Sequence, residues 1–198
     1  MRSAAINEIA IAAARLVADE GMEYGPAKRR AAQLLGRGSA RAAALPSNEA
    51  VEEEVRNHLA LFCAETQPAE LAALRGVAML WMERLEAFRP HVSGAVWRGT
   101  ATRLNAVQIE LYCDDSKAAE IALLDRRIGF EVASRSGPRG ETVDVLVLSQ
   151  PCTEIGDAVT VHLTVLDHDD LRGALKVDAQ GRTWRGDRMA LRKLLGSV

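Results

Sequence analysis

The feature that most constrains this sequence is a change in residue type near Pro90. Of its 33 alanines, 22 lie before residue 90, whereas of its eight threonines only Thr66 does. Alanine has the highest helix propensity, and threonine, like other β-branched residues, is enriched in strands. A chain of 198 residues is also long enough to bury a core. We therefore expect an α+β protein with a helical domain at residues 1–89 and an α/β domain at residues 90–198.

The first part of the chain predicts about four helices. Apolar side chains recur at helical spacing in four stretches, residues 6–21, 26–36, 47–66 and 68–88. Gly21 suits the C-terminal end of the first helix, and Ser47 or Asn48 can cap the start of the third. Residues 37–46 contain glycine, serine and proline and predict a connecting loop.

The second part predicts strands that form a mixed or antiparallel sheet with flanking helices. Residues 107–113 alternate between apolar and polar side chains, as a half-buried strand does. Residues 142–148 and 158–166 are rich in β-branched residues, and the Gly156-Asp157 pair between them predicts a hairpin. The other expected elements are a helix capped by Asp115 or Ser116, a strand at residues 130–133 and a last helix after Asp187.

Charge, hydropathy and cysteine content exclude several classes of protein. The net charge of -2 does not favour a strong nucleic-acid footprint, and charged residues interrupt every apolar run long enough to span a membrane. The three cysteines are odd in number and lack metal-ligand spacing. We expect reduced thiols in a cytoplasmic protein, and the sequence identifies no protein partner.

A glycine-containing segment leads directly into the predicted strand at residues 107–113. It opens with Gly94-Ala95, and Gly99-Thr100 follows five residues later. This arrangement resembles the strand-loop-strand of the polymerase-β-type nucleotidyltransferase superfamily, in which a Gly-Ser pair, a second glycine and an acidic-apolar-acidic triplet build the active site. The wider stretch 13–172, including residues 27–32, 45–48 and 169–172, is similar to a group of uncharacterised proteobacterial proteins assigned to this superfamily.

The resemblance implies a site for a nucleoside triphosphate and Mg²⁺. Glycines let backbone amides approach phosphates, and two carboxylates on alternate strand positions can hold Mg²⁺. A third carboxylate on a neighbouring strand would deprotonate or position the attacking hydroxyl. The residues implied at the nucleotide are Gly94, Ala95, Arg98, Gly99, Thr100 and Arg103.

The sequence departs from the family pattern at the expected metal ligands. The acidic pair falls on Ala106 and Gln108, and Ala95 stands where the family has serine. Alanine cannot ligate a metal, and glutamine offers only a neutral oxygen. Glu110 lies two residues further along the same strand face, so a shifted metal site at Gln108 and Glu110 is an alternative.

Two residues are candidates for the third carboxylate position. Asp144 and His162 are each polar residues inside an apolar strand. The final hairpin of the similar proteins favours His162, which can bind a metal or accept a proton but lacks the negative charge of an acid. The candidate catalytic residues are therefore Glu110, Asp144 and His162.

Three functions are compatible with this pattern. The first is a relative with reduced or lost transfer activity that acts as a nucleotide-binding or interaction module. The second is an active enzyme that transfers a nucleoside monophosphate to a hydroxyl through the shifted site. In the third, the resemblance is accidental, Gln108 and Glu110 lie on an exposed strand face, and the protein binds a partner without a ligand.

Overall fold

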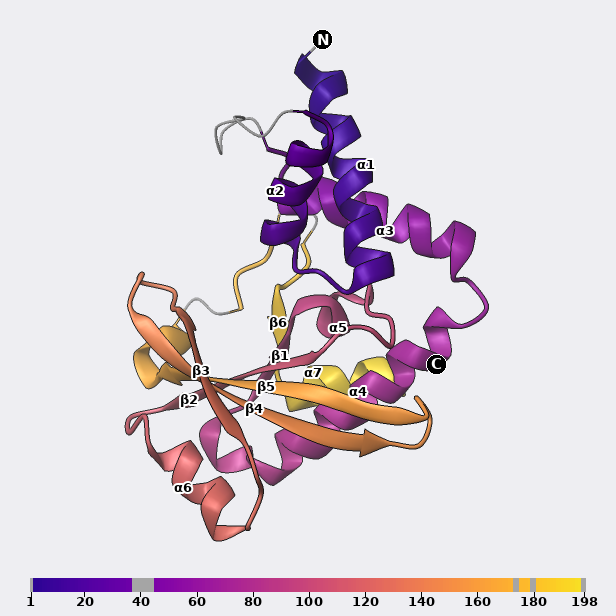
Figure 1. The fold of residues 1–198 in the computed structure, drawn as a ribbon. Coiled ribbons are helices and arrows are strands. Elements are labelled where there is room, and N and C mark those ends of the chain that lie inside the picture. The colour runs from indigo at the N-terminus through magenta and orange to yellow at the C-terminus, as the bar shows by residue number, and fades with distance from the viewer. Residues whose placement is uncertain (1, 37–44, 173–174, 179–180, 197–198) are drawn as a thin grey trace. The chain divides into compact units, whose positions relative to one another are not determined.

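The computed structural model describes residues 2–36, 45–172, 175–178 and 181–196. It is a mixed α+β structure with helices at the N-terminal end and one six-stranded sheet, as expected (Figure 1). The chain forms two compact units by contact. Unit 1 contains residues 1–68 and 100–105, and unit 2 contains residues 69–99 and 106–198. This grouping by contact differs from the predicted division at residue 90. A division into two domains at that residue stays a prediction.

Unit 1 is built from three helices, α1 (Arg2–Glu20), α2 (Tyr24–Leu34) and α3 (Asn48–Phe62). The predicted helices are confirmed here, although α3 ends at Phe62 and not near Thr66. Gly21 has a φ of 67° after α1, and the hydroxyl of Ser47 accepts a hydrogen bond from the N–H of Ala50. Most of the predicted loop at 37–46 falls on residues 37–44, which lie outside the described residues.

The alanine content of unit 1 determines how its helices pack. The core consists of small and β-branched side chains on facing helices, which lets the helix backbones approach closely. Its most buried members are Ile9, Ala10, Ala13, Ala14, Val17, Ala27, Ala31, Val51 and Val55. The helices are thus held by many small contacts and carry no buried aromatic residue in this cluster.

Unit 2 is organised around the sheet, whose strand order is β3-β4-β5-β2-β1-β6. The strands are β1 (His91–Ser93), β2 (Val107–Cys113), β3 (Glu131–Ser136), β4 (Thr142–Cys152), β5 (Asp157–Asp167) and β6 (Arg185–Gly186). Only β2 and β5 pair in parallel, and the other neighbours are antiparallel. The predicted strand at 107–113 and the predicted hairpin, now β4 and β5 with Gly156 at a φ of 76°, are confirmed.

The helices of unit 2 are α4 (Gln67–Arg84), whose first two residues belong to unit 1, α5 (Gly94–Arg98), α6 (Ala118–Asp125) and α7 (Arg188–Leu195). Helix α4 lies along the sheet in Figure 1 and buries Leu74, Trp81 and Met82. Short 3-10 turns follow at Glu86–Phe88 and His168–Leu171. No helix among the described residues is both long and apolar enough to cross a membrane.

The segment between β1 and β2 differs from the expected loop. Gly94 and Gly99 both have positive φ, at 65° and 79°, and they enclose the single-turn helix α5. The two glycines therefore mark the ends of a helix, because each supplies a left-handed backbone conformation that other residues rarely adopt. The three-residue strand β1 precedes Gly94, as a strand-loop-strand implies, whereas the two-residue β6 was not predicted, because no alternating pattern fits in so few positions.

Candidate functional site

Gln108 and His162 are brought together by the parallel pairing of β2 and β5. The two residues are directly opposite in register, and Gln108 Nε2 lies 2.9 Å from His162 Nδ1. An amide N–H donates in this contact, so Nδ1 accepts and the ring proton is assigned to Nε2. The second position of the expected acidic pair thus holds an amide, and its partner is the imidazole that is a candidate for the third carboxylate position.

Gly94 packs against the same glutamine. Ser93, the last residue of β1, is opposite Gln108 in the antiparallel pairing of β1 and β2. A Cβ atom added to Gly94 would lie 3.4 Å from Cγ of Gln108. The glycine that opens the motif therefore does lie beside the motif's strand, and Ala95, in the first turn of α5, has no hydroxyl to offer a ligand.

Arg98 is not oriented toward solvent as a loop arginine would be. It is buried, and its guanidinium donates to the Thr183 carbonyl and to Oδ2 of Asp178, each at 3.0 Å. It also lies 4.2 Å from the centre of the Trp184 ring, a cation–π contact. The side chain is thus held by the C-terminal part of the same chain.

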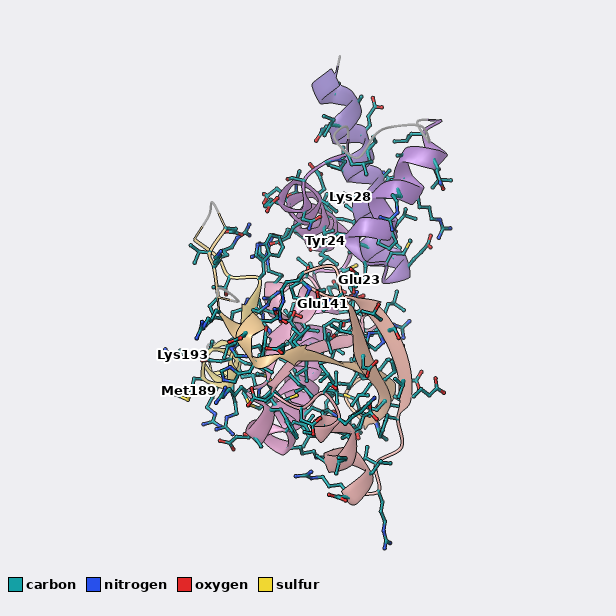
Figure 2. The ribbon with its side chains drawn as sticks, turned by 90° about the vertical axis from the view of Figure 1, so that its left-hand side faces the viewer. Glu23, Tyr24, Lys28, Glu141, Met189 and Lys193 are labelled. Atoms are coloured by element: carbon teal, nitrogen blue, oxygen red, sulfur yellow. The ribbon has the colours of Figure 1, made fainter. Side chains whose placement is uncertain are left out.

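Thr100 and Arg103, the other two implied nucleotide ligands, belong to unit 1. Thr100 is buried, and its hydroxyl lies 3.5 Å from the hydroxyl of Tyr24, whereas Arg103 is exposed. Tyr24 lies on α2, four residues before Lys28 (Figure 2). Of the implied nucleotide ligands, unit 2 therefore holds Gly94, Ala95, Arg98 and Gly99.

Glu110 is buried within a charged network of unit 2. Its Oε2 accepts a hydrogen bond of 2.6 Å from the Tyr112 hydroxyl and lies 2.9 Å from Nε of Arg185. Burial, and next the negative charge of Glu110, raise the pKa of Tyr112. The His91 ring meets the Tyr112 ring edge-on, with centroids 5.3 Å apart. Glu110 is thus neutralised by an arginine and does not lie on an open strand face.

Asp144 lies apart from Gln108 and His162. His162 is opposite Val147 on β4, and Asp144 is three residues from Val147, so its side chain is on the other face of the sheet. Its Oδ2 lies 3.1 Å from Lys117 Nζ, which also contacts Glu120 at 2.6 Å. These hydrogen bonds, first that of Glu120, raise the pKa of Lys117. The structure therefore groups His162, and not Asp144, with Gln108.

The carboxyl ends of β2 and β5 carry a cavity that sequence reasoning missed. It has a volume of about 290 Å³, and acidic residues dominate its charged lining, namely Asp114, Glu141, Asp144, Asp167 and Asp170. Glu141, labelled in Figure 2, comes from the turn before β4. Arg139 partly offsets this charge by pairing with Asp170 at 3.0 Å. The available signal was that acids directly follow both strands of the parallel pair, whose carboxyl ends meet at one edge of the sheet.

The donor set does not fit Mg²⁺ at the position that the resemblance implies. Ala106 has no ligating atom, Gln108 is hydrogen-bonded to an imidazole, and Glu110 is paired with Arg185. No group of three or more His, Cys, Asp or Glu side chains able to hold a metal ion occurs in the described part of the chain. Magnesium prefers anionic oxygens in octahedral geometry, which these residues do not supply.

Comparisons with known proteins add no relative. No protein-family model matches the chain, and no curated protein or solved structure matches it significantly. The case for any function therefore depends on the residues and geometry described above.

Proposed function

We propose that this protein is a reduced relative of the polymerase-β-type nucleotidyltransferases that binds a nucleotide or a partner through unit 2 without transferring a nucleoside monophosphate. The observation that carries the proposal is the contact between Gln108 and His162 across neighbouring strands. It lies where the resemblance expects carboxylates, and neither of its two partners is an acid.

The order of elements supports the family part of the proposal. The resemblance requires a glycine segment, a following strand that bears the first ligands, and a neighbouring strand that bears the third. In unit 2 these correspond to Gly94 after β1, Gln108 on β2, and His162 on β5. Gln108 and His162, which are 54 residues apart in the sequence, are thereby in contact, and Gly94 packs against Gln108.

The chemistry of those positions supports the loss of transfer. Transfer of a phosphoryl group needs concentrated positive charge at the phosphates, which a metal held by carboxylates normally supplies. Gln108 and His162 in its neutral form bring no negative charge to attract such a metal. Glu110, the one acid on this strand face, is already paired with a guanidinium.

The test is calorimetric titration of the full chain with each of the four nucleoside triphosphates, with Mg²⁺ and with excess EDTA. We expect binding that EDTA does not weaken and that Gln108→Ala or His162→Ala reduces. Lys193→Ala, an exposed substitution on α7, is the control, since this residue lies at the surface (Figure 2). Binding that requires Mg²⁺ and is lost in Glu110→Gln would contradict the proposal and support the active enzyme with a shifted site. No binding of any triphosphate would leave only the interaction module.

A restored site tests the family assignment separately. If the alignment is correct, Ala106→Asp, Gln108→Asp and His162→Asp together should create a cluster of acids that binds Mg²⁺. The matched variant with asparagine at the same three positions has nearly the same shape without the charge. Equal Mg²⁺ affinity of the aspartate and asparagine variants, both shown to be folded by circular dichroism, would contradict the assignment.

A further inference from the structure

A C-terminal segment made of Asp178 and residues 181–186 supplies charged groups to the region around α5 and β2. Asp178 contacts Arg98, and the Thr183 carbonyl accepts hydrogen bonds from both Trp97 and Arg98. The segment ends in β6, which pairs with β1 and lies beside α5 (Figure 1). Its last charged residue, Arg185, is thereby fixed next to Glu110.

The fit of the segment against α5 is close. A Cβ atom added to Gly186 would overlap the ring of Trp97. Trp97 is itself held by a hydrogen bond of 2.9 Å, which its Nε1–H donates to the Thr183 carbonyl. The Arg98–Asp178 pair is almost completely buried, with both side chains 2% exposed. Arg185 therefore reaches Glu110 from a backbone that is anchored on both sides.

The pair between Arg185 and Glu110 is an electrostatic contact. Arg185 Nε lies 2.9 Å from Glu110 Oε2, yet this buried Nε–H forms no hydrogen bond with the described residues, because it does not point along the contact. The charges are adjacent without the directional bond that usually accompanies such a pair. A cation beside a buried carboxylate offsets the cost of burying that charge.

We infer that Arg185 is the built-in cation of this site, taking at Glu110 the place that a divalent metal ion would otherwise fill. A metal ion bound at Glu110 Oε2 would lie beside the Arg185 guanidinium, and the repulsion between the two positive charges disfavours it. The chain thus provides positive charge from its own C-terminal segment. This inference rests on the proposed function, in which an anionic ligand binds near β2 without metal.

The experiment measures Mn²⁺ binding by electron paramagnetic resonance in the full chain and in three variants. Arg185→Gln removes the guanidinium, and Arg185→Gln with Glu110→Gln removes both charges. Arg192→Gln is the matched control, because Arg192 pairs with Glu83 at 3.2 Å on the exposed surface. We expect no Mn²⁺ bound at Glu110 in the unaltered protein or the control, weak binding in Arg185→Gln, and loss of that binding in the double variant.

Two results would overturn the inference. One is Mn²⁺ binding by the unaltered protein that is lost in a fourth variant, Glu110→Gln, shown to be folded by circular dichroism. The other is a folded Arg185→Gln variant that binds no more Mn²⁺ than the double variant. In a parallel titration with ATP, Arg185→Gln should become dependent on Mg²⁺ for binding. Failure of every variant to bind ATP would remove the nucleotide-binding form of the proposed function, whereas the Mn²⁺ measurements would still decide the role of Arg185.

Discussion

Charged side chains are arranged in opposite ways on the two sides of the parallel β2–β5 pair. Near α5 and β6, opposite charges are paired away from solvent, the buried Arg98 with Asp178 and the half-buried Arg185 with the buried Glu110. At the carboxyl ends of the same strands, acids line an open cavity and their partners Lys117 and Arg139 are largely exposed. The first side uses charge to hold the chain together, and the second presents it to solvent. The following predictions test this difference, beginning with the largest effect.

Removal of a buried guanidinium should cost far more than removal of an exposed ammonium. Arg98→Ala removes the guanidinium that pairs with the almost fully buried Asp178, so we expect a loss of about 3 kcal/mol in the free energy of unfolding. Lys117→Ala breaks exposed contacts with Asp144 and Glu120 and should lower the free energy of unfolding far less. Urea denaturation measures both, and similar losses would contradict the difference between the two sides.

A methyl group should destabilise the α5–β6 side by steric overlap. Gly186→Ala places a Cβ within the ring of Trp97, and we expect a loss of about 1–3 kcal/mol. Gly76→Ala is the matched substitution on α4, where no atom lies within 4 Å of the added Cβ. It should stabilise by about 0.5–1 kcal/mol, because alanine loses less backbone entropy in a helix. Opposite signs in thermal or urea denaturation are the expected outcome.

The hydrogen bond between Gln108 and His162 should fix the ring tautomer. Gln108→Leu removes the donor to Nδ1 and should cost about 1 kcal/mol of stability. Nitrogen chemical shifts of the His162 ring, measured by NMR, should lose their preference for a proton on Nε2. The ring of His58, which pairs with Asp19 in unit 1, should give unchanged shifts in the same spectrum. An unchanged His162 spectrum would show that Gln108 does not determine the tautomer of this ring.

The acidic residues at the carboxyl ends of β2 and β5 should make Cys113 react slowly with alkylating reagents. Burial, then the charges of Asp115, Asp114 and Asp167, raise the pKa of Cys113. Less thiolate is present at a given pH, so alkylation of Cys113 by iodoacetamide should be slow and reach half its maximal rate at a higher pH than a free cysteine. Added salt, or asparagine at the three aspartates, should increase the rate severalfold. Peptide mass spectrometry identifies the modified residue, and a rate insensitive to both changes would assign the pKa shift to burial alone.

The sequence was most informative where a pattern repeats along a strand or helix. The alternation at 107–113 gave the full extent of β2, and β-branched residues with Gly156 gave the β4–β5 hairpin. Helix α5 was missed because two glycines five residues apart are equally typical of a tight turn. Single-turn helices and two-residue strands are too short for periodicity to distinguish.

The partners of the candidate site residues could not be read from the sequence in the same way. Arg98 was expected at a phosphate because the resemblance places it in the nucleotide-binding segment, yet its acceptors lie at Asp178 and Thr183, 80 and 85 residues away. Glu110 likewise pairs with Arg185 from β6. Nothing in the local pattern of either residue encodes such a distant partner, since pairing follows from strand order. His162 opposite Gln108 is the exception, because both stand out as polar residues in apolar strands.

The late position of residues 178–186 in the chain has a consequence for protein synthesis. Asp178 is synthesised 80 residues after Arg98. At a synthesis rate of about 5–20 residues per second, this delay is roughly 4–16 s. Throughout that time Arg98 and Glu110 have no opposite charge from the C-terminal segment, and water must solvate them. The region around α5 is therefore expected to reach its final packing after most of the sheet has been made, which gives a chaperone or a small anion an interval in which to contact it.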